Sequence, residues 1–379
     1  MTRSQKKIVA ILTLIAAVLV IGAGYFAFQK YQAFAQQPLG PRLPASQVQL
    51  PPTWTPTVGA PAGSVTLVPT FAIPPTSTPQ PLCGGPYIMN IVAIGADSRA
   101  DNYDYGLSDA IRLVRVDFVT PKVSVLEFPR DLWVKIPHIA DNLEGVDEGK
   151  LNQAYLFGQP GDGFHYWDDP SGGPGLLSLT LNLNFGVQAD HYTAVNMRTF
   201  EKIIDAVGGI DIYVKDKDMS RATGLPQGEN HLEGADALRV ARNRKDGGFE
   251  RANNQNLVLC ALRKKVTSPA VVTQIPQLIE SFRDNILTDF TPAQLGQLAC
   301  LGTRLPTENI VFASFPEELF TPTRHKPDPY GQNPNGTFIW DADFEVLSDY
   351  VARFQAGTWP EPKLNIPDPN EETDEVICE

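Results

Sequence analysis

The hydrophobic pattern of this chain begins with one long apolar run and changes to short alternating segments only after a proline-rich stretch. Ile8–Phe28 contains no charged residue, and about 20 apolar residues are enough to cross a bilayer as a helix. Arg3, Lys6 and Lys7 precede the run, so the positive-inside rule places residues 1–7 in the cytoplasm. The pattern predicts a single-pass cell-membrane protein whose remaining chain is extracytoplasmic.

A cleaved leader is the alternative interpretation of the same run. Ala33-Phe34-Ala35 resembles the small-residue cleavage site of a secretory signal peptide. The apolar run 8–28 is longer than the core of a usual signal peptide, which favours an uncleaved anchor.

The stretch after the anchor has the composition of a linker. Residues 29–82, above all Gln36–Leu82, are rich in proline and threonine and nearly free of charge. Proline-rich chain favours extended polyproline II and forms no core. We therefore expect a semi-rigid or disordered spacer that lifts the rest of the chain off the membrane.

Strand and helix patterns follow one another through a single predicted domain, residues 83–365. Short apolar or alternating segments predict strands at Tyr87–Ile94, Ile111–Val119, Val123–Phe128, Tyr192–Asn196, Ile210–Val214 and Ile310–Phe315. Helical spacing predicts helices at Leu176–Leu183, Phe200–Val207, Gly234–Arg244, Glu250–Lys265, Pro276–Asn285 and Pro292–Leu301. This order predicts an α/β fold, a three-layer α/β/α sandwich with a mixed central sheet, followed by an acidic tail at 366–379.

The net charge and the cysteine content limit which partners and which covalent cross-links are expected. The formal net charge is -12, which argues against nucleic acid as a partner because phosphate backbones favour broad cationic surfaces. Four cysteines in a segment expected outside the cell permit two disulfides. Pairing Cys83 with Cys378 and Cys260 with Cys300 is the simplest arrangement, and the other two pairings stay open.

Against this acidic background, three arginines are concentrated at the junction of two predicted helices. Arg242, Arg244 and Arg251 lie within fourteen residues that end at Gln255. A guanidinium offers a planar fork of donors that matches phosphate oxygens. The cluster therefore favours a bound phosphate or pyrophosphate, although arginines at a solvated helix end would also complement the helix dipole.

Two carboxylates are candidates for a metal site. Asp97 follows the first predicted strand, and Asp109 opens the second after a glycine-containing loop. Carboxylates at adjacent strand ends can hold Mg²⁺, which prefers oxygen ligands. Their spacing alone is weak support, because aspartates often stabilise turns.

Further polar residues follow predicted strands. Arg99 comes just after the first strand, Arg130 ends the hairpin strand beside Asp131, and Lys150 and Asn152 lie beyond it. A neighbouring arginine and aspartate at a strand end, such as Arg130 and Asp131, often form a structural ion pair. We expect the cations among them to converge with the arginine cluster on one edge of the sheet, as an anion clamp with a bridging metal does.

A series of short segments carries this chemistry in a fixed order. They are Gly95-Ala96-Asp97-Ser98-Arg99, Ser108-Asp109, Phe128-Pro129-Arg130-Asp131, Lys150-Leu151-Asn152, Asp205-Ala206-Val207-Gly208-Gly209-Ile210, Gly234-Ala235-Asp236-Ala237-Leu238, Ala241-Arg242-Asn243-Arg244 and Phe249-Glu250-Arg251 with Gln255. The ordered series resembles the LytR-CpsA-Psr family of bacterial cell-wall proteins. The resemblance covers about residues 90–265 and extends to the anchor topology.

The resemblance implies a membrane-anchored transferase with an α/β/α fold. Members move a glycopolymer from a polyprenyl-pyrophosphate carrier onto peptidoglycan and leave polyprenyl phosphate. The resemblance implies Asp97 and Asp109 as ligands of Mg²⁺, and an apolar pocket for the lipid tail. The residues it implies for binding the pyrophosphate and stabilising its charge are Arg99, Arg130, Arg242, Arg244, Arg251 and Gln255, with Lys150 and Asn152 as further substrate contacts.

Three positions depart from the family pattern. Leu107 stands where an arginine is usual, Gly248 where an aspartate is usual, and Asn254 where a second arginine is usual. Loss of one phosphate-binding arginine costs about 3 kcal/mol of transition-state stabilisation, by analogy with an oxyanion-hole donor. The alternative function is therefore a catalytically degenerate module that binds polyprenyl phosphates and scaffolds wall assembly.

Nearby side chains are candidates to replace the missing groups. Arg112 or Lys245 could supply the arginine in space, and Asp246 could supply the acid.

Overall fold

The computed structural model describes residues 3–45, 79–98, 102–161, 163–243, 248–268, 271, 285–325 and 335–360. A mixed six-stranded sheet forms the centre of the domain, in the order β10-β3-β2-β1-β6-β9. These strands are β1 (Ile88–Ala96), β2 (Ser108–Asp117), β3 (Lys122–Glu127), β6 (His191–Asn196), β9 (Leu287–Thr288) and β10 (Ile310–Ser314). The pairs β1·β6 and β3·β10 are parallel and the other neighbours antiparallel, so the predicted mixed sheet is confirmed.

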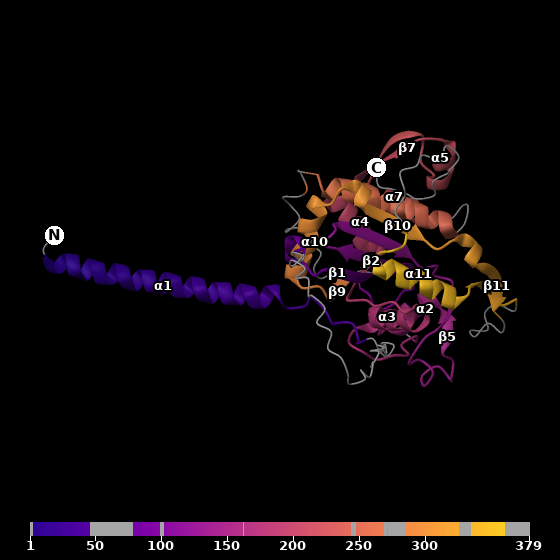
Figure 1. The fold of residues 1–379 in the computed structure, drawn as a ribbon, viewed down its shortest axis with the longest axis horizontal. Helices are drawn as coiled ribbons and strands as arrows, with labels where there is room; N and C mark the ends of the chain where they lie inside the picture. The colour runs from indigo at the N-terminus through magenta and orange to yellow at the C-terminus, as the bar shows by residue number, and fades with distance from the viewer. Residues whose placement is uncertain are drawn as a thin grey trace, which may run out of the picture.

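One face of the sheet is covered by α2 (Leu151–Phe157), α3 (Gly172–Phe185) and α11 (Phe344–Ala356) (Figure 1). Alternate strand residues such as Val92 and Leu113 point into this layer and meet Leu177 and Phe354, all of them buried. Such burial of one face per strand follows from the period-two direction of strand side chains. The main core of the domain therefore lies on this side.

The other face is covered by a second helical layer. It consists of α4 (Met197–Ala206), α6 (Gly234–Ala241), α7 (Gly248–Val266) and α10 (Pro292–Arg304). Ile204, Val240 and Val258 form a separate core among these helices. Together with the first layer, this arrangement gives the predicted α/β/α sandwich.

Shorter elements surround the sandwich. They are β4 (Trp133–Lys135), β5 (Glu148–Lys150), β7 (Ile210–Val214), α5 (Lys217–Thr223), β8 (Gly228–Leu232), β11 (Thr321–His325), β12 (Thr337–Asp341) and the 3-10 turns η1 (Leu82–Gly84), η2 (Thr307–Asn309) and η3 (Glu317–Leu319). The strand predicted at Ile210–Val214 is confirmed, but it pairs with β8 in a separate hairpin. The helix predicted at Pro276–Asn285 lies outside the described residues except for Asn285.

The N-terminal helix α1 (Arg3–Ala35) projects away from the sandwich as one long rod (Figure 1). Within the part of the chain whose side chains are described, no helix is both long and apolar enough to cross a membrane. The predicted transmembrane helix is thus not confirmed.

The predicted linker, 29–82, begins inside α1, and its described residues on either side of 46–78 contact the domain. The Leu39 N–H donates to the Phe290 carbonyl at 2.9 Å, and Leu43 packs against the main core. At the other end, the Leu82 N–H donates to the Phe118 carbonyl at 2.8 Å. The chain between these contacts is therefore fastened to the domain on both sides.

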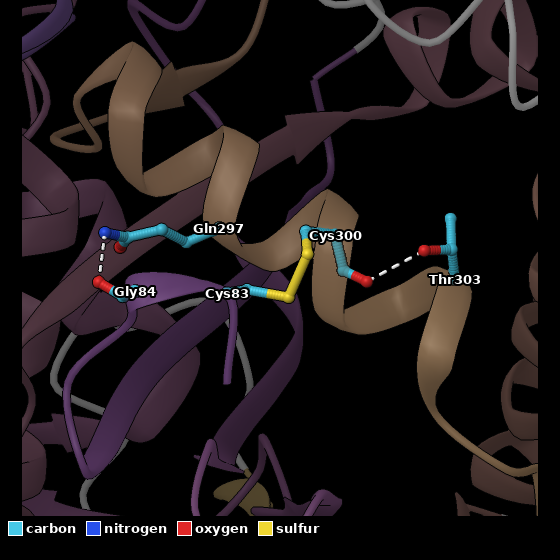
Figure 2. The surroundings of a disulfide bond; sticks show 5 residues. All are labelled: Cys83, Gly84, Gln297, Cys300 and Thr303. Carbon is cyan, nitrogen blue, oxygen red and sulfur yellow. Dashed lines mark hydrogen bonds between the residues drawn. A yellow bond between two sulfur atoms is a disulfide. The ribbon is translucent and has the colours of Figure 1, made fainter. Parts of the chain in front are cut away.

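The structure corrects the simplest disulfide pairing. Cys83 of η1 is bonded to Cys300 of α10 across 217 positions of sequence (Figure 2). Gln297 reinforces this junction by donating to the Gly84 carbonyl at 2.7 Å. Cys260 is also disulfide-bonded. The expected bonds Cys83–Cys378 and Cys260–Cys300 are wrong because η1 packs directly on α10, which sequence spacing does not reveal.

Candidate functional site

A β-bulge sets the position of Asp109. Gly95 pairs with Ala110 and Ala96 pairs with Ser108, so Asp109 has no partner on β1. Bulges of this kind bend a strand and redirect a side chain. Just beyond the bulge, the Asp97 N–H donates to the Leu107 carbonyl at 2.7 Å. The two predicted metal ligands therefore lie at one edge of the sheet.

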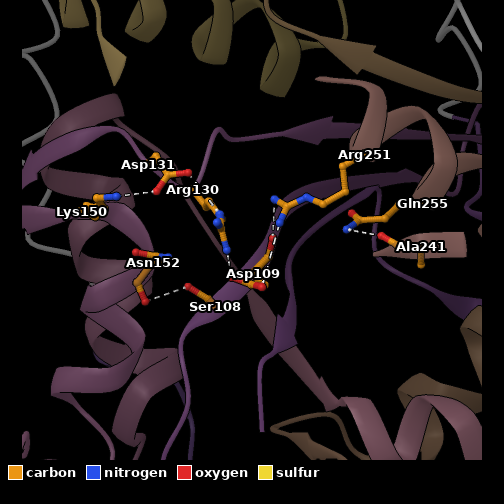
Figure 3. A network of polar contacts seen from close by, with 9 residues as sticks. All are labelled: Ser108, Asp109, Arg130, Asp131, Lys150, Asn152, Ala241, Arg251 and Gln255. Carbon is orange, nitrogen blue, oxygen red and sulfur yellow. Dashed lines mark hydrogen bonds and ion pairs between the residues drawn. The ribbon is translucent and has the colours of Figure 1, made fainter. Parts of the chain in front are cut away.

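Arg130 links Asp109 to a second carboxylate. Its Nη1 is ion-paired with the Asp109 carboxylate, and its Nε lies 3.2 Å from Asp131 (Figure 3). Lys150 Nζ contacts the other Asp131 oxygen at 2.8 Å. Burial alone would raise the pKa of Asp131, but the Lys150 hydrogen bond and the Arg130 charge outweigh it and hold the pKa below its usual value. Asp131 therefore stays ionised and positions two cations, which makes it a poor general base.

The same carboxylates act on Arg130 itself. Burial would lower the pKa of its guanidinium, but Asp109 and Asp131 outweigh burial and raise it. Arg130 is therefore a permanently charged, oriented donor.

Arg251 reaches Asp109 from the opposite side. Its Nη2 donates to the Asp109 backbone carbonyl at 2.9 Å, and its Nη1 lies 4.0 Å from the carboxylate (Figure 3). The side chain, on the first turn of α7, is only 8% exposed. Arg130 and Arg251 thus converge on Asp109 from elements far apart in sequence, as expected.

Arg112 occupies a buried position next to these groups. It donates to Glu127 at 2.8 Å, to Asn256 at 2.7 Å and to Gln255 at 3.1 Å. Gln255 in turn donates to the Ala241 carbonyl at 3.3 Å. Arg112 therefore fixes the Gln255 amide, a role that its sequence position did not indicate.

An apolar cavity of about 280 Å³ opens between the sheet and the second helical layer. Its walls come from β1, β2, β6, α4, α6 and α7, with side chains such as Val195, Phe200, Ile203, Val258 and Leu262. The polar residues that line it are Asp109, Arg112, Thr193, Asn196, Arg242, Arg251 and Gln255. The cavity therefore combines an apolar wall with cationic and hydrogen-bonding side chains.

The remaining predicted site residues lie as follows. Arg242 caps the end of α6, is exposed and lines the cavity. Asn152 is buried, and its N–H donates to the Arg130 carbonyl at 3.1 Å. Ser108 donates to the Asn152 carbonyl at 3.3 Å, which ties α2 to the bulge. Arg99 and Arg244 lie outside the described residues.

The residues that depart from the family pattern have local roles where they are described. Asn254 is buried and donates to the Ala222 carbonyl at 2.9 Å, so it fastens α7 to the end of α5. The Leu107 carbonyl accepts the Asp97 N–H at the sheet edge. Lys245 and Asp246 lie outside the described residues.

The donor set at the bulge fits a hard divalent cation only with help from a substrate. Among the described residues, no group of three or more His, Cys, Asp or Glu side chains comes together. Asp97 and Asp109 are two carboxylates at one edge, and Mg²⁺ commonly takes one or two carboxylates plus substrate phosphates. The arrangement is compatible with a metal that a phosphate ligand completes.

Comparison with known proteins identifies the family. The profile of the LytR_cpsA_psr family matches residues 86–344, more than half of the chain. The chain belongs to this family. It is 30% identical over 215 residues to the Regulatory protein MsrR of Staphylococcus aureus (strain COL), covering 55% of this chain and 58% of that protein. It is 31% identical over 213 residues to the Polyisoprenyl-teichoic acid--peptidoglycan teichoic acid transferase TagU of Oceanobacillus iheyensis, covering 55% of this chain and 61% of that protein.

These matches leave part of each relative uncovered, since the chain spans about three fifths of their length. Among solved structures, the fold is similar to TagV of B. subtilis, with a TM-score of 0.54 and 22% identity over 71% of this chain and 97% of that one. It is also similar to a structure titled TagT bound to LIIa-WTA, with a TM-score of 0.51 and 20% identity over 71% and 90% of the two chains. Both likenesses establish the fold.

Proposed function

We propose that this protein is a membrane-anchored phosphotransferase that moves a glycopolymer from a polyprenyl-pyrophosphate carrier onto peptidoglycan. The names of relatives such as the TagU transferase favour this class of reaction. The observation that carries the proposal is the apolar cavity whose polar lining includes Asp109, three arginines and the Gln255 amide.

That combination suits a lipid pyrophosphate better than a soluble phosphate ester. A polyprenyl tail needs an apolar wall, and the phosphates need charged donors held in place. Arg251 and Arg130 are held in place by contacts with Asp109 before any ligand binds. Donors fixed in this way lose little free energy in reorganising as charge develops on the leaving phosphate.

Arg242 supplies a different kind of donor. Its guanidinium forms no hydrogen bond or ion pair with another described residue, and it lines the same cavity. It is therefore available to an incoming phosphate, beside the two guanidinium groups already oriented. Arg99 and Arg244 would complete the clamp that the family resemblance implies.

Asp97 and Asp109 are the residues that would hold Mg²⁺ in this proposal. A bound metal would neutralise charge on the pyrophosphate oxygens. The chain's own contribution is to orient Arg130 and Arg251 around Asp109, so that the same carboxylate aligns two cations.

Anchoring through α1 belongs to the same proposal. Leu19, Val20, Ile21 and Phe26 are all more than 60% exposed along this projecting helix. Exposed apolar side chains in a continuous run are costly in water and favourable in a bilayer. The positive residues before Ile8 favour an extracytoplasmic domain.

The proposal is tested with the full-length chain in mixed micelles, given labelled polyprenyl-pyrophosphate glycan, peptidoglycan and Mg²⁺. We expect label in the wall fraction, lost on chelation of the metal. Label that stays on a tightly bound lipid would instead establish the non-catalytic binding module. If transfer occurs only in the Leu107→Arg variant, the loss of activity would be due to the leucine at position 107, where the family usually has an arginine.

A further inference from the structure

A second cavity shares the Arg242 side chain with the first as part of its lining. It has a volume of about 520 Å³ and is lined from α4, the end of α5 and α6. Leu238 and Arg242 line both cavities, so both border the end of α6. The volume lies within the roughly 300–1,000 Å³ of small-molecule sites.

The chemistry of this second cavity is polar where the first is apolar. Its lining side chains include Glu201, Thr223, Arg239, Arg242 and Asn243. A carboxylate accepts hydrogen bonds, a guanidinium donates them, and an amide does both. Such a set matches a ligand that carries several hydroxyl groups, each a donor and an acceptor.

Glu201 contributes a carboxylate to this lining. It lies on α4, half-buried, and makes no hydrogen bond or ion pair with another described residue. Two arginines line the same cavity without pairing with it: Arg239 contacts Asp236 at 2.9 Å, and Arg242 has no such contact in the described chain. A half-buried carboxylate without a partner keeps its full capacity to accept hydrogen bonds.

The walls of the cavity are fixed before any ligand arrives. Asn243 donates to the Ala222 carbonyl at 2.7 Å, which ties the end of α6 to α5. Thr223 is buried and donates to the Met219 carbonyl at 2.7 Å. Small residues, Gly224 and Ala235, leave the space between these walls open.

We infer that this cavity is a sugar subsite, and that it holds the sugar ring adjacent to the phosphorus bound at Arg242. The inference rests on the proposed function, because that function places a phosphate at Arg242. Glu201 accepts hydrogen bonds from ring hydroxyls there, and Arg239 and Asn243 border the ring. Both the transferred glycan and the acceptor glycan carry the hydroxyl chemistry that this site recognises.

The test uses binding without turnover, with the full-length chain in micelles and no Mg²⁺. Three probes are compared: polyprenyl pyrophosphate, the same lipid bearing one sugar, and a soluble β-1,4-linked N-acetylglucosamine tetramer. Glu201→Gln removes the charge without changing shape, and Ala235→Phe fills the cavity. Glu229→Gln makes the same chemical change on exposed β8, outside the cavity, and serves as the control.

We expect both cavity variants to bind a sugar-bearing probe at least tenfold more weakly while the sugar-free lipid binds as in wild type. Weakening of the sugar-bearing lipid assigns the subsite to the donor glycan, and weakening of the tetramer assigns it to the acceptor. Equal binding of every probe by wild type and variants would overturn the inference. Equal weakening of the sugar-free lipid would also overturn it. A wild-type chain that binds sugar here but transfers nothing would refute the proposed transfer reaction alone.

Discussion

Removal of the Arg251 guanidinium should affect both the stability of the fold and the rate of the proposed transfer reaction. In the folded protein its Nη2 donates to the Asp109 carbonyl at 2.9 Å from a position that is 8% exposed. A charged hydrogen bond of this kind contributes about 1.5–3 kcal/mol to stability. In the proposed transfer reaction the same group, which lines the cavity, would contact the phosphate, and loss of one oriented charge donor costs about 3–4 kcal/mol.

The two costs predict different readouts for Arg251→Ala and Arg251→Lys. Arg251→Ala should lower kcat for transfer by about 10²–10³-fold. Arg251→Lys keeps the charge but loses the fork that spans Asp109 and a phosphate oxygen, so most of the loss should remain. Arg221→Ala, which removes an exposed arginine paired with Asp218 on α5, is the matched control and should leave kcat unchanged.

Thermal unfolding of each variant shows whether it is folded at the assay temperature. The reasoning is refuted if folded Arg251→Ala transfers at the wild-type rate. It is equally refuted if Arg251→Lys restores full activity, because charge alone would then suffice.

Three further outcomes follow from the structure. Replacing Cys83 and Cys300 by alanine should destabilise the domain by up to about 5 kcal/mol, since the bond closes a loop of 217 positions. Chemical denaturation under oxidising conditions measures this loss of stability, and an unchanged midpoint would contradict the chain-entropy argument. Because the pKa of Asp131 is lowered in the folded protein, this carboxylate stabilises the fold at pH values above its unfolded pKa of about 3.9, and the contribution is lost as pH falls through the lower folded pKa. Asp131→Asn should therefore make the free energy of unfolding less dependent on pH in the acid range, and Asp236→Asn is the control. Leu259→Glu, at an exposed position that lines the apolar cavity, should weaken polyprenyl-phosphate binding at least tenfold without unfolding the protein; unchanged lipid affinity in a binding titration would place the tail elsewhere.

The sheet and the helices next to it were predictable because their side chains follow simple periods. The prediction for β1, Tyr87–Ile94, falls within two residues of the observed Ile88–Ala96 at each end. By contrast, β9 has only two residues, and its pairing with β6 depends on contacts that join distant parts of the chain. No local period encodes a strand of that length.

The site shows the same division between local and distant information. Residue types and their order identified Asp109, Arg130 and Arg251, and the structure brings them together. The bulge at Asp109 is set by the register of β1 against β2, which one sequence does not reveal. Nor could sequence show that Arg112 is bonded to Glu127 and Gln255, because that contact joins β2, β3 and α7. Arg112 is thus already neutralised by a carboxylate, which argues against it as a simple replacement for the arginine missing at position 107.

The position of α1 bears on how a carrier lipid would reach the site. α1 contacts α10 and leaves the domain beside α10 and β9, while β5 and β11 lie on the opposite side (Figure 1). Lys150 ends β5, so the Asp131 ion pairs lie away from α1. The apolar wall follows α7 from Arg251 to Leu262, a rise of about 16 Å at 1.5 Å per residue.

An anchored α1 would therefore hold the domain so that a lipid tail enters along this wall and its phosphates reach the arginines at the far end. Contacts of Leu39 and Leu43 with the domain make such an orientation fixed, because the chain just after α1 is already docked. The number of residues between 43 and 82 then has little influence on the height of the site above the membrane, since both ends of that stretch are fastened to the same domain. In an anchored protein the height would be set by the short connection between Ala35 and Leu39. Inserting flexible residues there should therefore slow transfer more than inserting the same residues after position 45.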